Sequence, residues 1–180
     1  MKTILFLNVS ILTLMLMFSS CKKDESVSPT NNTTPSPTEI TIGTIRAKVD
    51  GTLKTADRGV TAMMNAGPNS VQISGVGGLN TNIITFNLGI GNFNGIGTYD
   101  LGVHDSFGLG INALYQEVAL GSYACTPQYA ETKGKLTVSE YTAGNSIKGT
   151  FYYKAKKQGT SGNGTEFIEV TEGEFYISLK

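Results

Sequence analysis

Apolar side chains recur at every second position through much of this chain, which is the pattern of β-strands with one buried face. In "TIRAKVDG" these side chains are Ile45, Ala47 and Val49, and Asp50-Gly51 then supplies a hairpin turn signal. The same period occurs in "SVQISGV", "NIITFNLGI" and "SIKGTFYYKAK". In these segments we expect the following residues to face the core: Val71, Ile73 and Gly75; Ile84, Phe86, Leu88 and Ile90; Ile147, Phe151, Tyr153 and Ala155. The pattern predicts an all-β fold.

The last segment, "EFIEVTEGEFYISL", predicts a closing hairpin with its turn at Glu172-Gly173. Its core-facing residues would be Ile168 and Val170 before the turn, and Phe175, Ile177 and Leu179 after it. The sequence shows no helical stripe, because Gly, Asn or β-branched residues interrupt segments such as "EYTAGNS" and "TAMMNAG". Any helix should therefore be a single short turn.

Glycine supports this interpretation, since all 22 glycines lie at or after Gly43, where they can make turns between short strands. We expect a single domain over residues 39–180 with about nine to eleven strands, arranged as an antiparallel β-sandwich. A partly closed antiparallel β-barrel is the alternative. The sandwich is favoured because a ligand-holding barrel tends to need longer and more uniform strands.

The N-terminus reads as a secretory signal peptide over residues 1–20. A lysine is followed by the apolar run "ILFLNVSILTLMLMF", which is too short to span a bilayer. The "FSSC" of residues 18–21 resembles a bacterial lipobox. That resemblance implies cleavage between Ser20 and Cys21, and a covalent lipid such as palmitate on Cys21. The alternative is an ordinary cleaved signal peptide with an incidental cysteine nearby.

The run "KKDE" after Cys21 is similar to the export tags of surface lipoproteins of Bacteroidota. From there the chain is rich in Ser, Thr, Asn and Pro, so residues 21–38 should be a disordered tether behind the lipidated cysteine. Acyl chains hold a protein at a membrane because each buried CH₂ contributes about 0.8 kcal/mol. We therefore expect a protein of the cell envelope, lipid-anchored in the outer membrane and either inward-facing or exposed at the cell surface.

Three segments of the domain resemble a family of uncharacterised Bacteroidota lipoproteins: "ITFNLGIGNFNGIGTYDLG", "GKLTVSEYTAGNSIKGTFYYKA" and "EVTEGEFYISL". In that family a strand leads into a Gly-x-Gly-Thr-Tyr-x-Leu-Gly turn, and a Leu-Thr-Val-like strand pairs with a Gly-Thr-Phe strand. A Gly-x-Phe strand ends the chain. The resemblance implies an all-β lipoprotein and no enzymatic activity.

Charge and cysteine content restrict the partners. The 14 Lys and Arg balance the 14 Asp and Glu, so no basic field is available to attract nucleic acid. With Cys21 acylated, Cys125 is the one cysteine left in the domain, and neither a disulfide nor a cysteine-rich zinc site is expected. We expect a monomer with no metal and no cofactor besides the covalent lipid.

A histidine-based enzyme would have to use His104, the one histidine of the sequence. In "GVHDSFG" it precedes Asp105 and Ser106, but adjacent residues of an extended chain point to opposite faces and do not readily form the base and orienting residue of a triad. Cys125 could be a nucleophile if His104 lay beside it, although an isolated cysteine is more commonly a small buried residue. A hydrolase using His104 is the less favoured alternative.

A candidate ligand platform lies on the outward side of "KGTFYYKAKK". If this strand pairs with the last one, Tyr152 and Tyr176 would form an aromatic surface edged by Lys154 and other lysines. Such a surface suits stacking against a sugar ring or binding an acidic polymer. The alternative is a cross-strand aromatic pair that only stabilises the sheet, by about 0.2 to 1 kcal/mol.

Together these features predict a membrane-anchored all-β lipoprotein that acts as a binding or envelope-surface module. Its partner would be a glycan or an envelope protein, in addition to the membrane itself. The alternative is a structural envelope component without a small ligand.

Overall fold

The computed structural model of the chain describes residues 39–65, 69–104, 108, 110–159 and 166–179. They belong to one compact unit, Thr38–Lys180. The predicted signal peptide, its cleavage site at Ser20 and Cys21, and the tether lie outside the described residues. Among the residues described, no helix is long and apolar enough to cross a membrane.

The described residues form eleven strands and one short 3-10 helix, η1, so the predicted number of strands is confirmed. The elements in chain order are β1 (Thr44–Val49), β2 (Thr52–Asn65), β3 (Ser70–Gly77), η1 (Asn80–Asn82), β4 (Ile84–Ile90), β5 (Gly97–Leu101), β6 (Val103–His104), β7 (Gly110–Glu117), β8 (Gly121–Cys125), β9 (Gly134–Thr142), β10 (Ser146–Lys157) and β11 (Phe167–Ser178).

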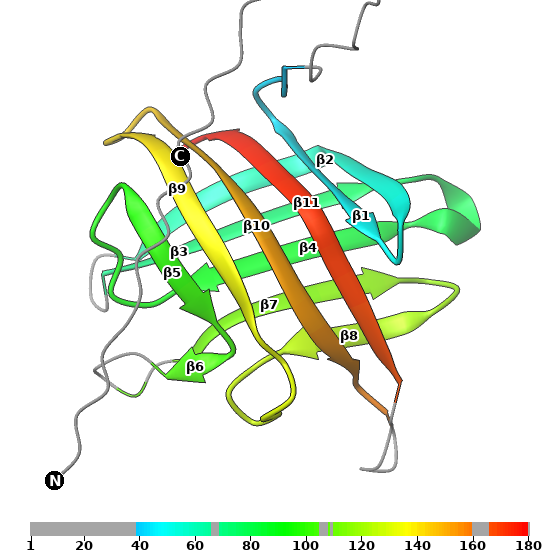
Figure 1. The fold of residues 1–180 in the computed structure, drawn as a ribbon. Coiled ribbons are helices and arrows are strands. Elements are labelled where there is room, and N and C mark those ends of the chain that lie inside the picture. The colour runs from blue at the N-terminus through cyan, green and yellow to red at the C-terminus, as the bar shows by residue number, and fades with distance from the viewer. Residues whose placement is uncertain (1–38, 66–68, 105–107, 109, 160–165, 180) are drawn as a thin grey trace, which may run out of the picture. The chain divides into compact units, whose positions relative to one another are not determined.

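Eight of the strands form a closed antiparallel barrel in the order β1, β2, β3, β4, β7, β8, β10 and β11, which the pairing of β11 with β1 closes. β9 pairs with the first part of β10, β5 pairs with β9, and β6 pairs with β7. In Figure 1, β9, β10 and β11 cross in front of β2, β3, β4 and β7. The predicted sandwich is therefore wrong, and the alternative, a barrel, is the fold.

A bulge in β11 explains part of that error. The predicted hairpin turn at Glu172-Gly173 is absent, and the chain continues as one strand of 12 residues. Glu172 has φ +50°, and the register of β11 shifts there against both β1 and β10. Because a bulge adds one residue to a strand, it bends the strand and raises its twist, which helps a sheet to close on itself. The strands are thus longer than the sequence suggested: β2 has 14 residues and β10 has 12.

The alternation predicted from the sequence is confirmed. Inward and outward positions alternate through β1, β3, β4 and β10, with the expected residues buried. The predicted turn after β1 is also present, with positive φ at Asp50 (+46°) and Gly51 (+80°), as a tight hairpin connection requires. The only helix among the residues described is a single short turn, as expected.

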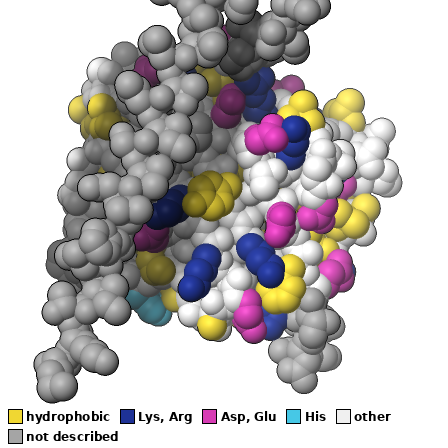
Figure 2. Space-filling view, viewed as in Figure 1, with side chains coloured by type: hydrophobic (Ala, Val, Ile, Leu, Met, Phe, Trp, Pro, Cys, Tyr) yellow, Lys and Arg dark blue, Asp and Glu magenta, His cyan; other side chains and the backbone are white. Residues whose placement is uncertain are grey.

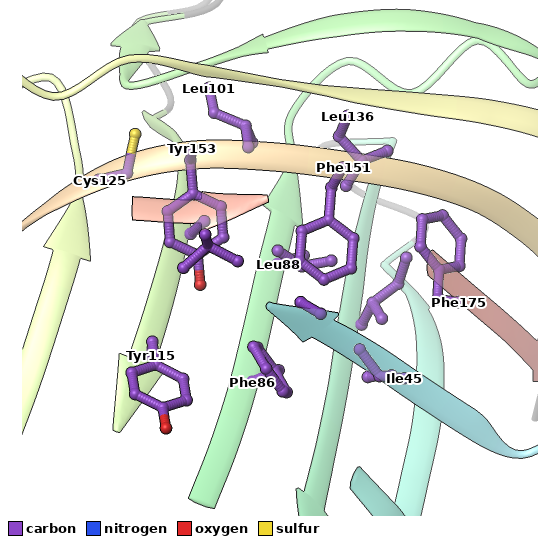
Figure 3. Close-up of a cluster of buried hydrophobic side chains, with 14 of the residues drawn as sticks. Ile45, Phe86, Leu88, Leu101, Tyr115, Cys125, Leu136, Phe151, Tyr153 and Phe175 are labelled. Carbon is purple, nitrogen blue, oxygen red and sulfur yellow. The ribbon is translucent and has the colours of Figure 1, made fainter. Parts of the chain in front are cut away.

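Large aromatic side chains fill the interior of the barrel (Figure 3). The ring of Phe86 lies 5.2 Å from that of Tyr115 and 6.0 Å from that of Phe151, measured between centroids. Phe151 in turn stacks on Phe175 at 6.4 Å. Small barrels of this kind have interiors that side chains fill. The candidate binding surfaces lie on the outside of the barrel.

One ion pair is buried where β2 begins and β7 ends. The Lys54 ammonium lies 2.9 and 3.0 Å from the two carboxylate oxygens of Glu117, which is only 8% exposed. The Tyr115 hydroxyl donates to the same carboxylate at 2.5 Å. Burial alone would raise the pKa of Glu117, but the hydrogen bonds from Tyr115 and Lys54 outweigh it and lower that pKa. Glu117 is therefore held as a carboxylate inside the structure.

Candidate ligand-binding face

The outward side chains of β9, β10, β11 and β1 form a surface that we call the charged-aromatic face. β10 and β11 pair along their length, which meets the condition set for the predicted platform, and alternate residues of β10 point outward as predicted. Figure 2 shows this side of the molecule, with basic and acidic side chains gathered around hydrophobic ones. Tyr152 is the large hydrophobic residue of β10 that stands out from the sheet, with 51% of its surface exposed.

The register does not bring the two predicted platform tyrosines together. Tyr176 lies opposite Lys148, whose ammonium is 5.4 Å from the centroid of its ring, whereas Tyr152 lies opposite Lys135 on β9. Four residues separate Lys148 from Tyr152 along one strand, or about 13 Å. Lys154 is also engaged elsewhere, since its ammonium lies 4.5 Å from the ring centroid of Phe167. Tyr152 is thus the candidate ligand-binding tyrosine. Its neighbours are not the predicted Tyr176 and Lys154.

Those neighbours enclose a shallow hollow of about 320 Å³, which we call the Tyr152 hollow. Tyr152 forms one side, on β10, and Glu172 and Glu174 form the other, on β11. The remaining lining residues are Thr150, Phe151 and Gly173. An aromatic ring, a hydroxyl group and two carboxylates therefore surround one concave surface.

The bulge in β11 builds the floor of this hollow. A Cβ atom on Gly173 would lie 2.5 Å from the carbonyl oxygen of Phe151 and 2.6 Å from its ring. Only glycine fits, because that Cβ would point into the barrel against Phe151, so glycine here lets β10 and β11 pair closely beneath the hollow. The bulge also gives Glu172 its positive φ, and so the backbone irregularity that closes the barrel shapes the hollow as well.

Basic residues of β1 hold both carboxylates in position. The Arg46 guanidinium donates to one Glu174 oxygen from two nitrogens, at 2.7 and 3.1 Å. Lys48 lies 2.8 Å from the Glu172 carboxylate. Because an ionised carboxylate offers about four acceptor positions, these groups can still accept hydrogen bonds from a ligand. The ion pairs fix the carboxylates without using all of that capacity.

The residues considered for catalysis lie elsewhere. His104 is exposed at the end of β6, with its Nδ1 3.1 Å from the carbonyl oxygen of Gly108. Cys125 is buried at the end of β8, and burial raises the pKa of its thiol to about 11, although a hydrogen bond with Thr132 opposes that shift. Within the described ranges no hydrogen bond joins His104 to Cys125, and Asp105 and Ser106 lie outside those ranges. At neutral pH the Cys125 thiol is protonated.

Two acidic residues outside the Tyr152 hollow are paired with lysines. Glu166 lies 2.8 Å from Lys157, and Asp100 lies 2.7 Å from Lys135. The part of the chain that the structure describes holds no group of three or more His, Cys, Asp or Glu side chains able to bind a metal ion.

Sequence reasoning identified Tyr152 but missed its partners Thr150, Glu172 and Glu174. A signal for them exists in the sequence. The apolar residues of the last segment fall on even positions up to Val170 and on odd positions from Phe175, and a bulge explains that change as well as a turn does.

The fold and this face define a closed β-barrel domain with a candidate ligand-binding surface on its outside. Residues 41–177 match the family described as "Domain of unknown function (DUF6252)", and the chain belongs to that family. No curated protein and no solved structure matches it.

Proposed function

We propose that this protein is a lipid-anchored lipoprotein of the outer membrane whose barrel binds a glycan at the Tyr152 hollow. The predicted signal peptide and lipobox support the anchor at Cys21. The observation that carries the binding activity is a half-exposed tyrosine beside a hollow whose opposite wall holds two positioned carboxylates.

Sugar chemistry fits this arrangement. The C–H face of a pyranose ring is apolar and can stack on the ring of Tyr152, as other apolar groups pack on aromatic faces. Its hydroxyl groups can donate to the carboxylates of Glu172 and Glu174, and hydrogen bonds to charged acceptors are stronger than those between neutral groups. An acidic polymer fits the hollow less well, because both carboxylates would repel it.

Glycan binding can be tested with the chain from residue 22 to 180, which lacks only the signal peptide and the acylated cysteine. An array of neutral and amino-sugar oligosaccharides provides the probe, and titration calorimetry gives affinities for those that bind. Tyr152→Ala should weaken binding about tenfold, the equivalent of about 1.4 kcal/mol, because it removes the stacking surface. Tyr152→Phe keeps the ring and should keep most of the affinity.

Tyr176→Ala provides a matched control, since it removes a tyrosine of the same face that lies beneath Lys148 and outside the hollow. It should leave the affinity unchanged. Equal binding by the wild type and by Tyr152→Ala would contradict the proposed site, and an array without any bound oligosaccharide would contradict the proposed activity.

The anchor has its own test. Mass spectrometry of the protein extracted from its native membrane should find an N-terminal peptide that begins at Cys21 and carries acyl chains. Cys21→Ala should leave the signal peptide uncleaved and abolish the acylation. A native chain with an unmodified Cys21 thiol, or one that begins at another residue, would overturn the placement at the membrane.

A further inference from the structure

A second hollow lies on a part of the barrel that carries almost no charge. Residues 59–99 contain no Asp, Glu, Lys, Arg or His, and they include the second half of β2 and all of β3 and β4. β7, which pairs with β4, has uncharged outward residues throughout. We call the outward surface of these four strands the amide face, after the polar side chains it presents: Asn65, Gln72, Asn87, Asn112 and Gln116, with Thr61, Ser70, Ser74 and Thr85.

One row of directly paired residues crosses the whole amide face. Met63 on β2 pairs with Gln72 on β3, which pairs with Gly89 on β4, which pairs with Asn112 on β7. Since neighbouring strands lie about 4.8 Å apart, the backbones that carry the two amides are about 9 to 10 Å from each other, with the bare backbone of Gly89 between them. The row therefore forms a slot with an amide on each side.

This slot is part of a surface hollow of about 300 Å³, which we call the amide hollow. Asn65, Gln72 and Asn112 contribute side-chain amides to its lining, and Gly89, Gly91 and Gly110 contribute bare backbone. Its volume is at the lower end of the range for small-molecule sites, and suits one or two sugar rings. Met63, which is 57% exposed, stands next to Gln72 and offers an apolar contact at the edge.

The fold itself does not require glycine at two of these positions. Gly89 lies in an unbroken stretch of pairing with both neighbours, without a positive φ, and a Cβ there would meet only the Asn112 side-chain oxygen, at 3.1 Å. A Cβ on Gly110 would make ordinary contacts, at 3.7 Å or more. Glycine inside a strand otherwise costs stability, and it is kept at bulges, at tight bends of a barrel, or where a ligand or another backbone comes close. No backbone lies closer than 3.8 Å to a Cβ at Gly89, which favours a ligand there.

Hydrogen bonds fix the backbone beside one end of the amide hollow, next to Ser70, and the Gln72 amide in its lining is free to bind a ligand. The Asn69 amide donates to the Phe93 carbonyl at 2.6 Å, and the Phe93 N–H donates back to the Asn69 carbonyl at 2.7 Å, which ties the β2–β3 connection to the segment after β4. The Gln72 side chain makes no hydrogen bond to any other described residue. Its donor and acceptor thus both remain available to a ligand.

We propose that the amide hollow is a second carbohydrate site, which takes a neutral glycan. Each sugar hydroxyl both donates and accepts, and a side-chain amide does the same, so the two match without any charge. A charged ligand would lose its hydration there without gaining a counter-ion. This site lies on different strands from the Tyr152 hollow and does not depend on it.

The test uses the chain of residues 22–180 with Tyr152→Ala, so that binding at the Tyr152 hollow is removed. Neutral gluco-, manno- and xylo-oligosaccharides, with uronic acid and sulfated counterparts, are titrated and followed by calorimetry. We expect binding of at least one neutral oligosaccharide and none of its charged counterparts. The affinity should be the same in about 50 mM and 500 mM NaCl, because no charge takes part.

Gln72→Ala and Asn112→Ala should each weaken this binding about tenfold, and Gly89→Val should abolish it by filling the slot. Asn87→Ala is the matched control, because it removes an outward amide two residues from Gly89 on the same strand that does not line the hollow. Circular dichroism confirms that each variant is folded. The proposal is overturned if no neutral oligosaccharide binds, if Gln72→Ala and Asn112→Ala both bind like their parent, or if Asn87→Ala weakens binding as much as they do.

Discussion

The charged-aromatic face and the amide face share one barrel interior but differ in how their outward side chains are satisfied. On the former, ion pairs join neighbouring strands, such as Lys148 with Glu140 at 3.0 Å and Lys135 with Asp100 at 2.7 Å. On the amide face, uncharged hydroxyl and amide groups join neighbouring strands, as in the 3.1 Å hydrogen bond between the hydroxyls of Thr61 and Ser74. Both solutions stabilise a sheet through cross-strand pairs. The inward positions determine the fold, and the outward ones are free to differ in chemistry.

The largest effect is expected at the buried charge pair near the amide face, Lys54 with Glu117. Lys54→Met should destabilise the protein by about 3 kcal/mol, because it leaves the Glu117 carboxylate without its counter-ion. Urea unfolding at neutral pH measures the difference. Lys135→Met, on the charged-aromatic face, is the matched control. Its ion pair is exposed, so its removal should cause no measurable change.

The pH dependence sharpens the same prediction. The folded state lowers the pKa of Glu117 below its ordinary value of 4.5, so this group stabilises the protein above that pH, and the contribution is lost as the pH falls through the folded pKa. In Lys54→Met the hydrogen bond and the charge of Lys54 are both gone, so burial outweighs the Tyr115 hydrogen bond and raises the folded pKa of Glu117. The stability deficit of the variant against the wild type should therefore shrink as the pH falls and Glu117 takes up a proton. Unfolding curves of both proteins between neutral pH and about pH 3 measure this convergence. Identical pH profiles for the two proteins would show that the pair is not buried as described.

A smaller difference in stability is expected between alanine substitutions of one glycine from each region, Gly173 and Gly89. Gly173→Ala should cost about 2 kcal/mol, because its Cβ would overlap Phe151 where two backbones come close. Gly89→Ala meets only the end of the Asn112 side chain, so its effect should lie within about 0.5 kcal/mol and can be stabilising. Chemical unfolding of both variants provides the comparison. Equal losses would mean that Gly89 is a structural glycine, and would remove one argument for the amide hollow.

The smallest expected effect is the absence of a reaction. Cys125 is fully buried, and its raised pKa keeps it protonated at neutral pH, so a thiol reagent should not label it in the folded chain of residues 22–180. Labelling should become complete once urea unfolds the protein. Fast labelling of the folded protein that is lost in His104→Ala would instead support the alternative of a histidine-assisted nucleophile.

Much of the fold could be predicted from local pattern, because the period of two reports directly which side chains are buried. The interior residues of β1, β3, β4 and β10 and the turn at Asp50-Gly51 were identified in this way. The Tyr152 hollow was only half predicted, since the tyrosine is visible as an outward residue but its partners depend on register. The amide face had a clear signal, the absence of charge over residues 59–99, although only the pairing of four strands shows that it is one surface.

The sequence alone determined that this chain forms antiparallel strands, and which side of most of them faces the core, because those are local properties of alternation and turn residues. The tertiary structure decided that the sheet closes, since closure rests on the pairing of β11 with β1, two strands that lie at opposite ends of the domain sequence. Strand register likewise placed Glu172 and Glu174 in the same hollow as Tyr152, and Gln72 and Asn112 on either side of Gly89. A shift of one residue would turn every side chain of a strand to the other face, so no local pattern can specify these neighbours.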